Sequence, residues 1–375
     1  MKPSSYALNL LKGMLEIYSP SGREASIASF LKDEMEKLGY RAHIDGVGNV
    51  VGTVEGSGRG PNVLLCGHMD TVPGFIPVKE VNGNIYGRGA VDAKSPLAAM
   101  IIAGSRYAEK GTGRITLAAV VDEEGLSKGI KYLIETMPQP DYALFGEPGG
   151  ASSVTIGYKG SISVSVKLKT RTGHTAASWL YDNAVEKGYE LWQLLRAQLA
   201  KYVVKGSYYK SLTWCLTSVK TITRPGLVPY GSLLNFNLRL PPGLTVEEAV
   251  SLVEGVIQDF KRVNPRVKVG FNVLDAVEPV EVKPSSILVR AFQRAVMKKL
   301  GVKAILVRKT GTGDMNVAAS KWRIPMVTYG PGDPKLDHTP DEHVNLNDYL
   351  NSIEVLVEAL HTLSGLHGSI NPVKA

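Results

Sequence analysis

Histidine and acidic side chains follow several apolar segments of this 375-residue sequence, each at the point where the segment ends. His68 and Asp70 follow residues 63–66 in CGHMDTVPG, and Glu123 and Glu124 follow residues 115–121. Three more belong to the same set: Asp92 in GRGAVDAKSP, Glu147 in GEP and His338 in DHTPDEH. Imidazole and carboxylate are ligands that zinc, cobalt and manganese accept. The set could therefore hold divalent metal ions.

Each of these segments also has a structural explanation when it is taken alone. A histidine and an aspartate at a strand end can simply cap the strand by hydrogen bonding, and DEEG or GEPGG can be solvated turns. His338 among acids could be one half of a surface ion pair. The joint placement favours a metal site, because the carboxyl ends of parallel strands meet at one edge of a sheet. Carboxylates crowded at that edge need a cation among them.

A pair of ions would explain why so many carboxylates are needed. Two divalent ions about 3.5–4 Å apart activate water and polarise a carbonyl group. One carboxylate then bridges the ions and another stays free to accept a proton. Since neighbouring side chains diverge, we expect Glu124 to bind metal and Glu123 to face the water.

The elements that carry these residues alternate between strands and helices. Strands with apolar character throughout are typical of a parallel sheet that is buried on both faces. The pattern predicts an α/β domain with a mostly parallel sheet and helices on both faces. Strands are expected at residues 50–54, 63–66, 115–121, 142–145 and 326–329, and helices at 24–38, 95–110, 128–136, 285–300 and 349–363.

The pattern changes after about residue 157. SISVSVKLKT (161–170) and LLNFNLRLP (233–241) alternate strictly between apolar and polar residues, as half-exposed antiparallel strands do. We expect helices at residues 183–199 and 245–263 and a strand at 267–273, which together make an α+β unit. The sequence thus predicts a catalytic domain of residues 1–157 and 278–375, interrupted by an inserted domain of residues 158–277.

Composition limits the functions that the chain can have. The apolar run 97–103 is far shorter than the roughly 18 residues of a membrane span, and the N-terminal segment is typical of an amphipathic helix. Cys66 and Cys215 form no disulfide framework or CxxC motif, which favours a cytoplasmic protein. A net charge of +8, from 43 Lys and Arg against 35 Asp and Glu, could indicate nucleic acid, an acidic protein partner or an anionic substrate. Nucleic-acid binding is disfavoured, because the basic residues are scattered along the sequence and no recognition motif is present.

Five ordered motifs, GHMDTVP, GRGAVDAK, DEEG, GEP and HTPDE, resemble the signature segments of a known family. They are similar to the two-metal aminoacylase and carboxypeptidase-type hydrolases, which include succinyl-diaminopimelate desuccinylase and acetylornithine deacetylase. The resemblance implies a set of ligands for two ions, for which we expect zinc, with cobalt or manganese as alternatives. These are His68 and Glu147 on one ion, Glu124 and His338 on the other, and Asp92 between the two.

The same resemblance implies roles for residues beside the ligands. Glu123 would be the general base and then the acid that protonates the leaving amine. Asp70 would orient His68, as metal-bound imidazoles require. A cis peptide bond between Asp92 and Ala93 is also implied.

The inserted domain resembles the family's lid and dimerisation domain, so a homodimer is expected. His174 in RTGHTAAS is similar to the lid histidine that stabilises the oxyanion, often across a dimer. Ser178 and Trp179 replace the proline that commonly follows this run, and a surface histidine without a role remains an alternative.

Substrate binding is expected at three further residues. RKTGTGDMN (308–316) is a glycine-rich loop that includes Arg308 and Gly311, and relatives use it around the substrate carboxylate. Arg239 or Arg308 could bind a carboxylate through a bidentate fork, although each could equally serve solubility. The loop lacks the Lys-Ser/Thr ending of a phosphate-binding loop.

Within the family, GHMDTVPG, GRGAVDAKSPLAAM and GYKGSI look most like the archaeal-type hydrolases that release lysine or ornithine from an amino-group carrier protein. The amino acid would be held there in an amide with the carrier's terminal glutamate side chain. Such carriers are acidic, which suits a partner of charge +8. A deacylase or carboxypeptidase for small N-acyl substrates is the alternative within this chemistry. A non-catalytic binding protein on the same fold is the alternative of another class, although Glu123 would then have no purpose.

Overall fold

The computed structural model describes residues 3–370, which fold into two compact units. The first comprises Met1–Gly157, Val282–Val307 and Gly313–Ala375, and the second comprises Tyr158–Glu281 and Arg308–Thr312. Residues 278–281 and 308–312 thus belong with the second unit, whereas the sequence places them in the first. Hydrogen bonding explains the grouping, because Lys159 N donates to the Lys309 carbonyl and Arg308 forms an ion pair with Glu281.

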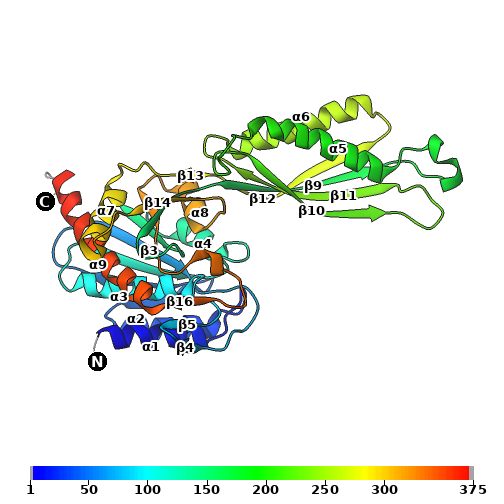
Figure 1. The fold of residues 1–375 in the computed structure, drawn as a ribbon. Helices are drawn as coiled ribbons and strands as arrows, with labels where there is room; N and C mark the ends of the chain where they lie inside the picture. The colour runs from blue at the N-terminus through cyan, green and yellow to red at the C-terminus, as the bar shows by residue number, and fades with distance from the viewer. Residues whose placement is uncertain (1–2, 371–375) are drawn as a thin grey trace. The chain divides into compact units, whose positions relative to one another are not determined.

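A nine-stranded sheet is the centre of the first unit (Figure 1). Its order is β1-β2-β6-β3-β7-β15-β8-β13, with β14 paired to β8. The central strands β6, β3, β7 and β15 are parallel, whereas β1, β2 and β8 pair in antiparallel fashion. The strands are β1 (Arg41–Ile44), β2 (Val50–Glu55), β3 (Asn62–His68), β6 (Arg114–Val120), β7 (Tyr142–Gly146), β8 (Ser153–Tyr158), β13 (Val280–Glu281), β14 (Ile305–Lys309) and β15 (Met326–Thr328).

Helices cover both faces of this sheet, which confirms the predicted α/β class. α3 joins β3 to β6 and α4 joins β6 to β7, and right-handed crossovers in opposite directions place the two helices on opposite faces. α9 packs with α3, and α8 packs with α4 (Figure 1). The helices are α1 (Pro3–Glu16), α2 (Ala25–Lys37), α3 (Lys94–Ala108), α4 (Lys128–Thr136), α7 (Ile287–Leu300), α8 (Asp314–Lys321) and α9 (Leu346–Ile370).

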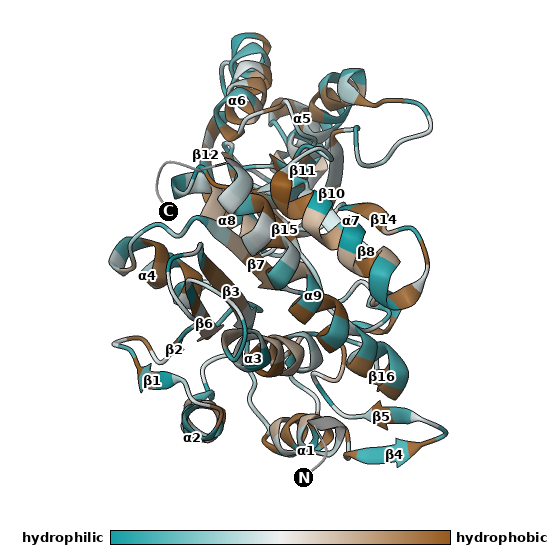
Figure 2. Ribbon diagram, turned by 90° about the vertical axis from the view of Figure 1, so that its left-hand side faces the viewer, coloured by the Kyte–Doolittle hydropathy of each residue, from teal (hydrophilic) through white to brown (hydrophobic). Residues whose placement is uncertain are grey.

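Burial explains why the central strands lack a polar face. Every residue of β3 after Asn62 is buried, whereas the rim strand β4 (Lys79–Val81) is exposed throughout. Figure 2 shows the hydrophilic colour of β4 against the hydrophobic β7. β4 belongs to a small sheet of order β16-β5-β4, with β5 (Asn84–Tyr86) and β16 (His343–Asn345). This small sheet joins the chain ahead of Asp92 to the chain after His338, since β5 pairs with β16.

The second unit is a four-stranded antiparallel sheet of order β10-β11-β9-β12, packed against two helices. Along β9 (Gly160–Lys169), Ile162, Val164, Val166 and Leu168 face a common core with the helices, and the residues between them face outward. The predicted alternation is thereby confirmed. The other strands are β10 (Thr213–Ile222), β11 (Gly231–Leu240) and β12 (Lys268–Val277), the helices are α5 (Ala184–Leu199) and α6 (Val246–Val263), and the short 3-10 turns are Thr175–Leu180, Ala200–Tyr202 and, in the first unit, Pro334–Leu336.

The structure of residues 3–370 addresses what the composition predicts about membrane spans and cysteines. None of the helices in residues 3–370 combines the length and apolarity that crossing a bilayer requires. Cys66 is buried, Cys215 is exposed, and both are free thiols.

We predict that Phe236→Ala destabilises the second unit by about 3–5 kcal/mol, because it opens a cavity in a closed core. Phe236 is 1% exposed and its ring centroid lies 5.3 Å from that of Trp192. Urea unfolding followed by tryptophan fluorescence measures the change. Val263→Ala, at the exposed last residue of α6, is the control and should cost less than about 1 kcal/mol. Equal losses in both variants would show that Phe236 does not support this core.

Candidate metal centre

Strand ends of the first unit bring the predicted site residues together. His68 is the last residue of β3, Glu123 and Glu124 follow β6, and Glu147 follows β7. β3 lies between the other two strands, with His68 paired to Val120 and Gly67 paired to Gly146. The parallel register therefore delivers an imidazole and three carboxylates to one edge of the sheet.

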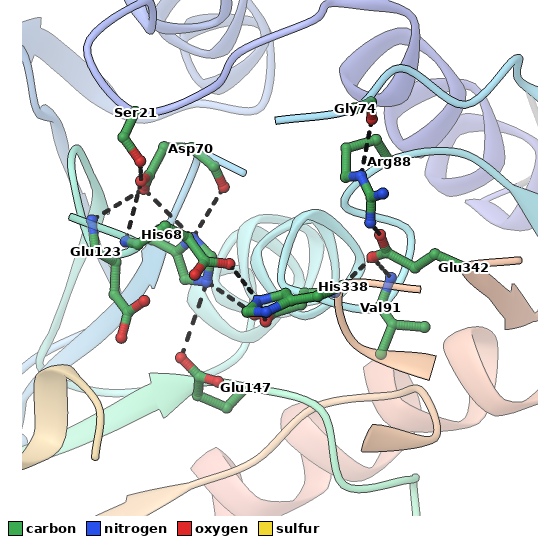
Figure 3. Close-up of polar contacts among 12 residues, drawn as sticks. Ser21, His68, Asp70, Gly74, Arg88, Val91, Glu123, Glu147, His338 and Glu342 are labelled. Atoms are coloured by element: carbon green, nitrogen blue, oxygen red, sulfur yellow. Dashed lines mark hydrogen bonds and ion pairs between the residues drawn. The ribbon is translucent and has the colours of Figure 1, made fainter. Parts of the chain in front are cut away.

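Two clusters of potential metal ligands occupy this edge (Figure 3). His68 Nε2 lies 3.1 Å from Asp92 Oδ1 and 3.9 Å from Glu147 Oε1. His338 Nε2 lies 2.9 Å from Asp92 Oδ2 and 2.8 Å from Glu124 Oε1. Within each cluster the ligand atoms lie within 4.8 Å of one another. Each cluster could hold one divalent ion.

Asp92 belongs to both clusters. Its Oδ1 faces His68 and its Oδ2 faces His338, which is the arrangement that a bridging carboxylate requires. The peptide bond between Asp92 and Ala93 is cis, as the family resemblance implies. The loop thus presents the two oxygens of one side chain to two histidines from distant parts of the chain.

The electrostatics of the edge fit a pair of cations. Burial raises the pKa of Glu123 well above its usual value, and the negative charges of Glu147 and Asp314 raise it further. Burial acts in the same direction on Asp92, but contacts with His338 and His68 hold its pKa below the usual value. The residues present therefore supply more negative charge than the two imidazoles balance, which divalent ions would offset.

Asp70 fixes the orientation of His68 and of the DEEG turn at once. The His68 Nδ1–H donates to the Asp70 carbonyl at 3.0 Å, which leaves Nε2 as the nitrogen available to a metal. The Asp70 side chain is fully buried and accepts hydrogen bonds from Ser21 Oγ at 2.7 Å and from the backbone N of Glu123 and Glu124 at 3.1 Å each. One carboxylate thereby ties the end of β3 to the segment after β6.

Glu123 and Glu124 diverge, as expected for neighbouring side chains. The Glu124 carboxylate contacts His338, whereas Glu123 belongs to neither ligand cluster. A side-chain carbon placed at Gly313 would lie 3.8 Å from Glu123 Oε1 and 4.0 Å from Glu147 Oε1. Glu123 is thus beside the clusters but separate from them, a position that suits a base.

Comparison with known proteins identifies the family. The family described as peptidase family M20/M25/M40 matches residues 64–362, a span that includes all five ligand candidates. The chain belongs to this family. A relative from Pyrococcus furiosus is 40% identical over 357 residues, which is 95% of this chain and 97% of that protein. A protein of Deinococcus radiodurans named LysW-lysine hydrolase is 34% identical over 96% of this chain and 97% of its own length.

A solved structure shows the same fold. The tripeptidase of Staphylococcus aureus superimposes with a TM-score of 0.82 at 19% identity, over 96% of this chain and 99% of the tripeptidase chain. The family and its hydrolase relatives make this M20 protein a hydrolase.

A buried ion pair in this M20 protein holds the Asp92 loop, and the sequence did not predict it. Glu342 Oε1 accepts hydrogen bonds from the backbone N of Val91 at 2.9 Å and of Asp92 at 3.0 Å. Its Oε2 contacts Arg88 Nη1 at 2.8 Å, and Arg88 Nε donates to the Gly74 carbonyl at 2.9 Å (Figure 3). Glu342 follows His338 in HTPDE and Arg88 precedes Asp92 in GRGAVDAK, so the motifs contained the signal.

Asp314 is a second residue that the sequence did not single out. It begins α8 and is 5% exposed, and its Oδ1 is buried without a hydrogen-bond partner. Burial, together with the charges of Glu147 and Asp70, raises the pKa of Asp314 to about 8. The loop 308–316 therefore ends in a helix whose first residue adds another acid to the centre.

The remaining predicted site residues belong to the second unit. His174 is exposed, and its Nδ1 accepts from Ala176 N at 3.1 Å, so Nε2 carries the proton. Arg239 is half-buried and its Nη1 lies 3.3 Å from Thr312 Oγ1. Arg308 is engaged by Glu281, and the space around Gly311 is open.

We predict that Glu342→Gln lowers the affinity for divalent metal by about 10–100-fold, because the Asp92 loop loses its charged acceptor. Competition with a chromogenic chelator measures the affinity. Glu80→Gln, which alters an exposed glutamate paired with Lys12, is the control and should leave it unchanged. The double variant Arg88→Met/Glu342→Gln removes the unpaired guanidinium and separates lost stability from lost metal binding. Wild-type affinity in stably folded Glu342→Gln would contradict the role of this ion pair.

Proposed function

We propose that this M20 hydrolase uses two divalent metal ions to release lysine, ornithine or both from a small acidic amino-group carrier protein. The bond cleaved is the amide between the amino acid and the terminal glutamate side chain of the carrier. The shared position of Asp92 between two ligand clusters is the observation that carries the chemistry. The substrate follows from full-length relatives such as the Deinococcus radiodurans protein, which is named for lysine joined to the carrier LysW. Such a reaction would complete lysine biosynthesis, or arginine biosynthesis when ornithine is released, in the cytoplasm.

We assign the metal ligands as the geometry groups them. His68 and Glu147 would hold one ion, Glu124 and His338 the other, and Asp92 both. Imidazole with carboxylate favours zinc, with cobalt or manganese as alternatives. When bound, the two ions would polarise the scissile carbonyl and lower the pKa of the attacking water.

Glu123 is the proposed general base and acid. Its carboxylate accepts a proton as water attacks the amide carbon, and it delivers that proton to the nitrogen when the carbon–nitrogen bond breaks. The products are the free amine of lysine or ornithine and the carboxylate of the carrier. Its burial among other carboxylates, which raises its pKa, helps Glu123 to hold the proton between the two steps.

We assign the second unit, predicted as residues 158–277, as lid and dimerisation domain. The protonated Nε2 of His174 is a hydrogen-bond donor suited to an oxyanion, and Arg239, Arg308 and Gly311 are the proposed substrate-binding residues. A homodimer is supported by β10, which is an edge strand with the exposed side chains Val219 and Ile222.

We predict that Glu123→Gln lowers kcat by roughly 10²–10⁴-fold while fold and metal content stay unchanged. The amide keeps the size of the side chain but cannot accept the proton. Turnover of a lysine–carrier conjugate, with metal analysis of the same samples, measures both quantities. Glu109→Gln, at an exposed position after α3, is the control. Retained turnover in Glu123→Gln would remove this residue from the mechanism.

We expect kcat/KM to be higher for lysine or ornithine conjugates of the carrier than for acetyl-lysine or acetylornithine. The carrier adds contacts that a small acyl group cannot make. Assaying all four substrates with the same metal-loaded enzyme ranks them. Preference for the acetylated amino acids would instead identify a small-molecule deacylase.

A further inference from the structure

All of the positive charge excess of this chain lies in the second unit. Residues Tyr158–Glu281 and Arg308–Thr312 contain 18 Lys and Arg against 10 Asp and Glu, whereas the rest of the chain contains 25 of each. The unit with the metal-ligand clusters is thus formally neutral, and the other has a net charge of +8. The charge excess therefore belongs to the inserted unit and not to the chain as a whole.

Strand register collects four of these charges on one face of the sheet. Lys167 and Lys169 face outward from β9, because the residues between them face the helices. Lys268 on β12 is the partner of Lys169, and Lys220 on β10 pairs with Leu233, which itself pairs with Lys167. Strands lie roughly 4.8 Å apart and alternate residues about 7 Å apart, so the four ammonium groups share two adjacent rows. We define Lys167, Lys169, Lys220 and Lys268 as the lysine face.

Nothing within the second unit neutralises this face. All four side chains are exposed, and none of them takes part in the ion pairs found among residues 3–370. Lys187, Arg262 and Arg266 of the same unit, by contrast, do have acidic partners. Lys169 and Lys268 lie directly opposite each other, an arrangement of like charges that destabilises a sheet. This pair of like charges therefore favours a role outside folding.

The lysine face lies at the end of the sheet from which His174 projects. After β9 the chain continues through Thr172, whose Oγ1 donates to the Val228 carbonyl, to His174, which forms a bridge with Leu227. Lys169 is five residues from His174 along this extended segment. A partner on the lysine face would therefore lie next to the residue assigned to the oxyanion.

We propose that the lysine face is the docking site for the acidic body of the carrier protein. This inference rests on the proposed function for its occupant. The chemistry required is a cluster of carboxylates on a folded surface, matched to four ammonium groups on rigid strands. Electrostatic attraction of this kind accelerates encounter and fixes the direction from which the linked amino acid arrives.

The same face is poorly suited to single-stranded nucleic acid. Binding of unpaired bases relies on aromatic side chains for stacking. The outward positions along the described strands carry no aromatic residue. They are Ser161, Ser163, Ser165, Lys167 and Lys169 on β9, Gly231, Leu233, Asn235, Asn237 and Arg239 on β11, Thr213, Cys215, Ser218, Lys220 and Ile222 on β10, and Lys268, Gly270, Asn272, Asp275 and Val277 on β12.

Titration of the carrier without its amino acid onto charge-reversed enzyme tests the docking site. We expect K169E/K268E to weaken binding at least about tenfold, and wild-type binding to weaken with added salt. R196E/K201E makes the same charge change at exposed positions of the helical side, and should bind within about twofold of wild type. K169Q/K268Q removes the repulsion without adding negative charge, so it provides a folded variant if the reversal disturbs the sheet.

Turnover measurements distinguish a failure of the docking site from a failure of the proposed function. K169E/K268E should raise KM for the lysine–carrier conjugate and leave kcat/KM for free γ-glutamyl-lysine unchanged. Equal carrier binding by K169E/K268E and R196E/K201E, or tighter binding of single-stranded DNA than of the carrier to wild type, would overturn the docking site. If wild-type enzyme turns over acetyl-lysine but not the conjugate, the proposed function fails, and carrier titration still decides the docking site.

Discussion

The candidate centre depends on one carboxylate that faces two histidines. This arrangement is favoured by a backbone that is fixed before any metal arrives, because a flexible loop would let the side chain turn toward one histidine alone. Glu342 accepts a hydrogen bond from the backbone N of Asp92 and so fixes that backbone. The Asp70 carbonyl orients the ring of His68, and strand β3 holds the backbone of His68 in place. Such preorganisation is what a site for two ions requires.

The sheet makes the candidate metal centre rigid, and the loops after its strands supply the charged side chains. The buried central strands are almost entirely apolar along their length, so most polar groups appear where the strands end. Hydrogen bonds from backbone N–H groups offset the cost of gathering acids there. Four of them go to Asp70 and Glu342, from the backbone N of Glu123, Glu124, Val91 and Asp92. The two units thus divide the electrostatic work, with acids around the metal clusters and lysines on the second sheet.

The sequence predicted those parts of the fold and of the candidate site that depend on local residue patterns. Alternation of apolar strands and helices indicated the α/β class, and acids or histidines placed directly after those strands indicated which side chains meet. It missed β10, whose alternation is interrupted by a bulge between Leu216 and Ser218, and α8, whose first turn was taken as part of a glycine-rich loop. Glu342 was missed because its contacts, with Arg88 and with two backbone N–H groups, lie far away in the sequence. No sequence pattern shows that Lys169 and Lys268 are neighbours, since strand pairing alone brings them together.

The position of the lysine face has a consequence for repeated turnover. A carrier bound through its folded body presents the same acidic surface before and after it loses its amino acid. These four lysines therefore cannot distinguish a carrier that still holds its amino acid from a spent carrier. If the lysine face is the docking site, the spent carrier would compete with the loaded carrier, and rapid exchange would favour a weak, solvent-exposed interface. Four exposed ammonium groups provide such an interface, which leaves discrimination between carrier states to the metal centre.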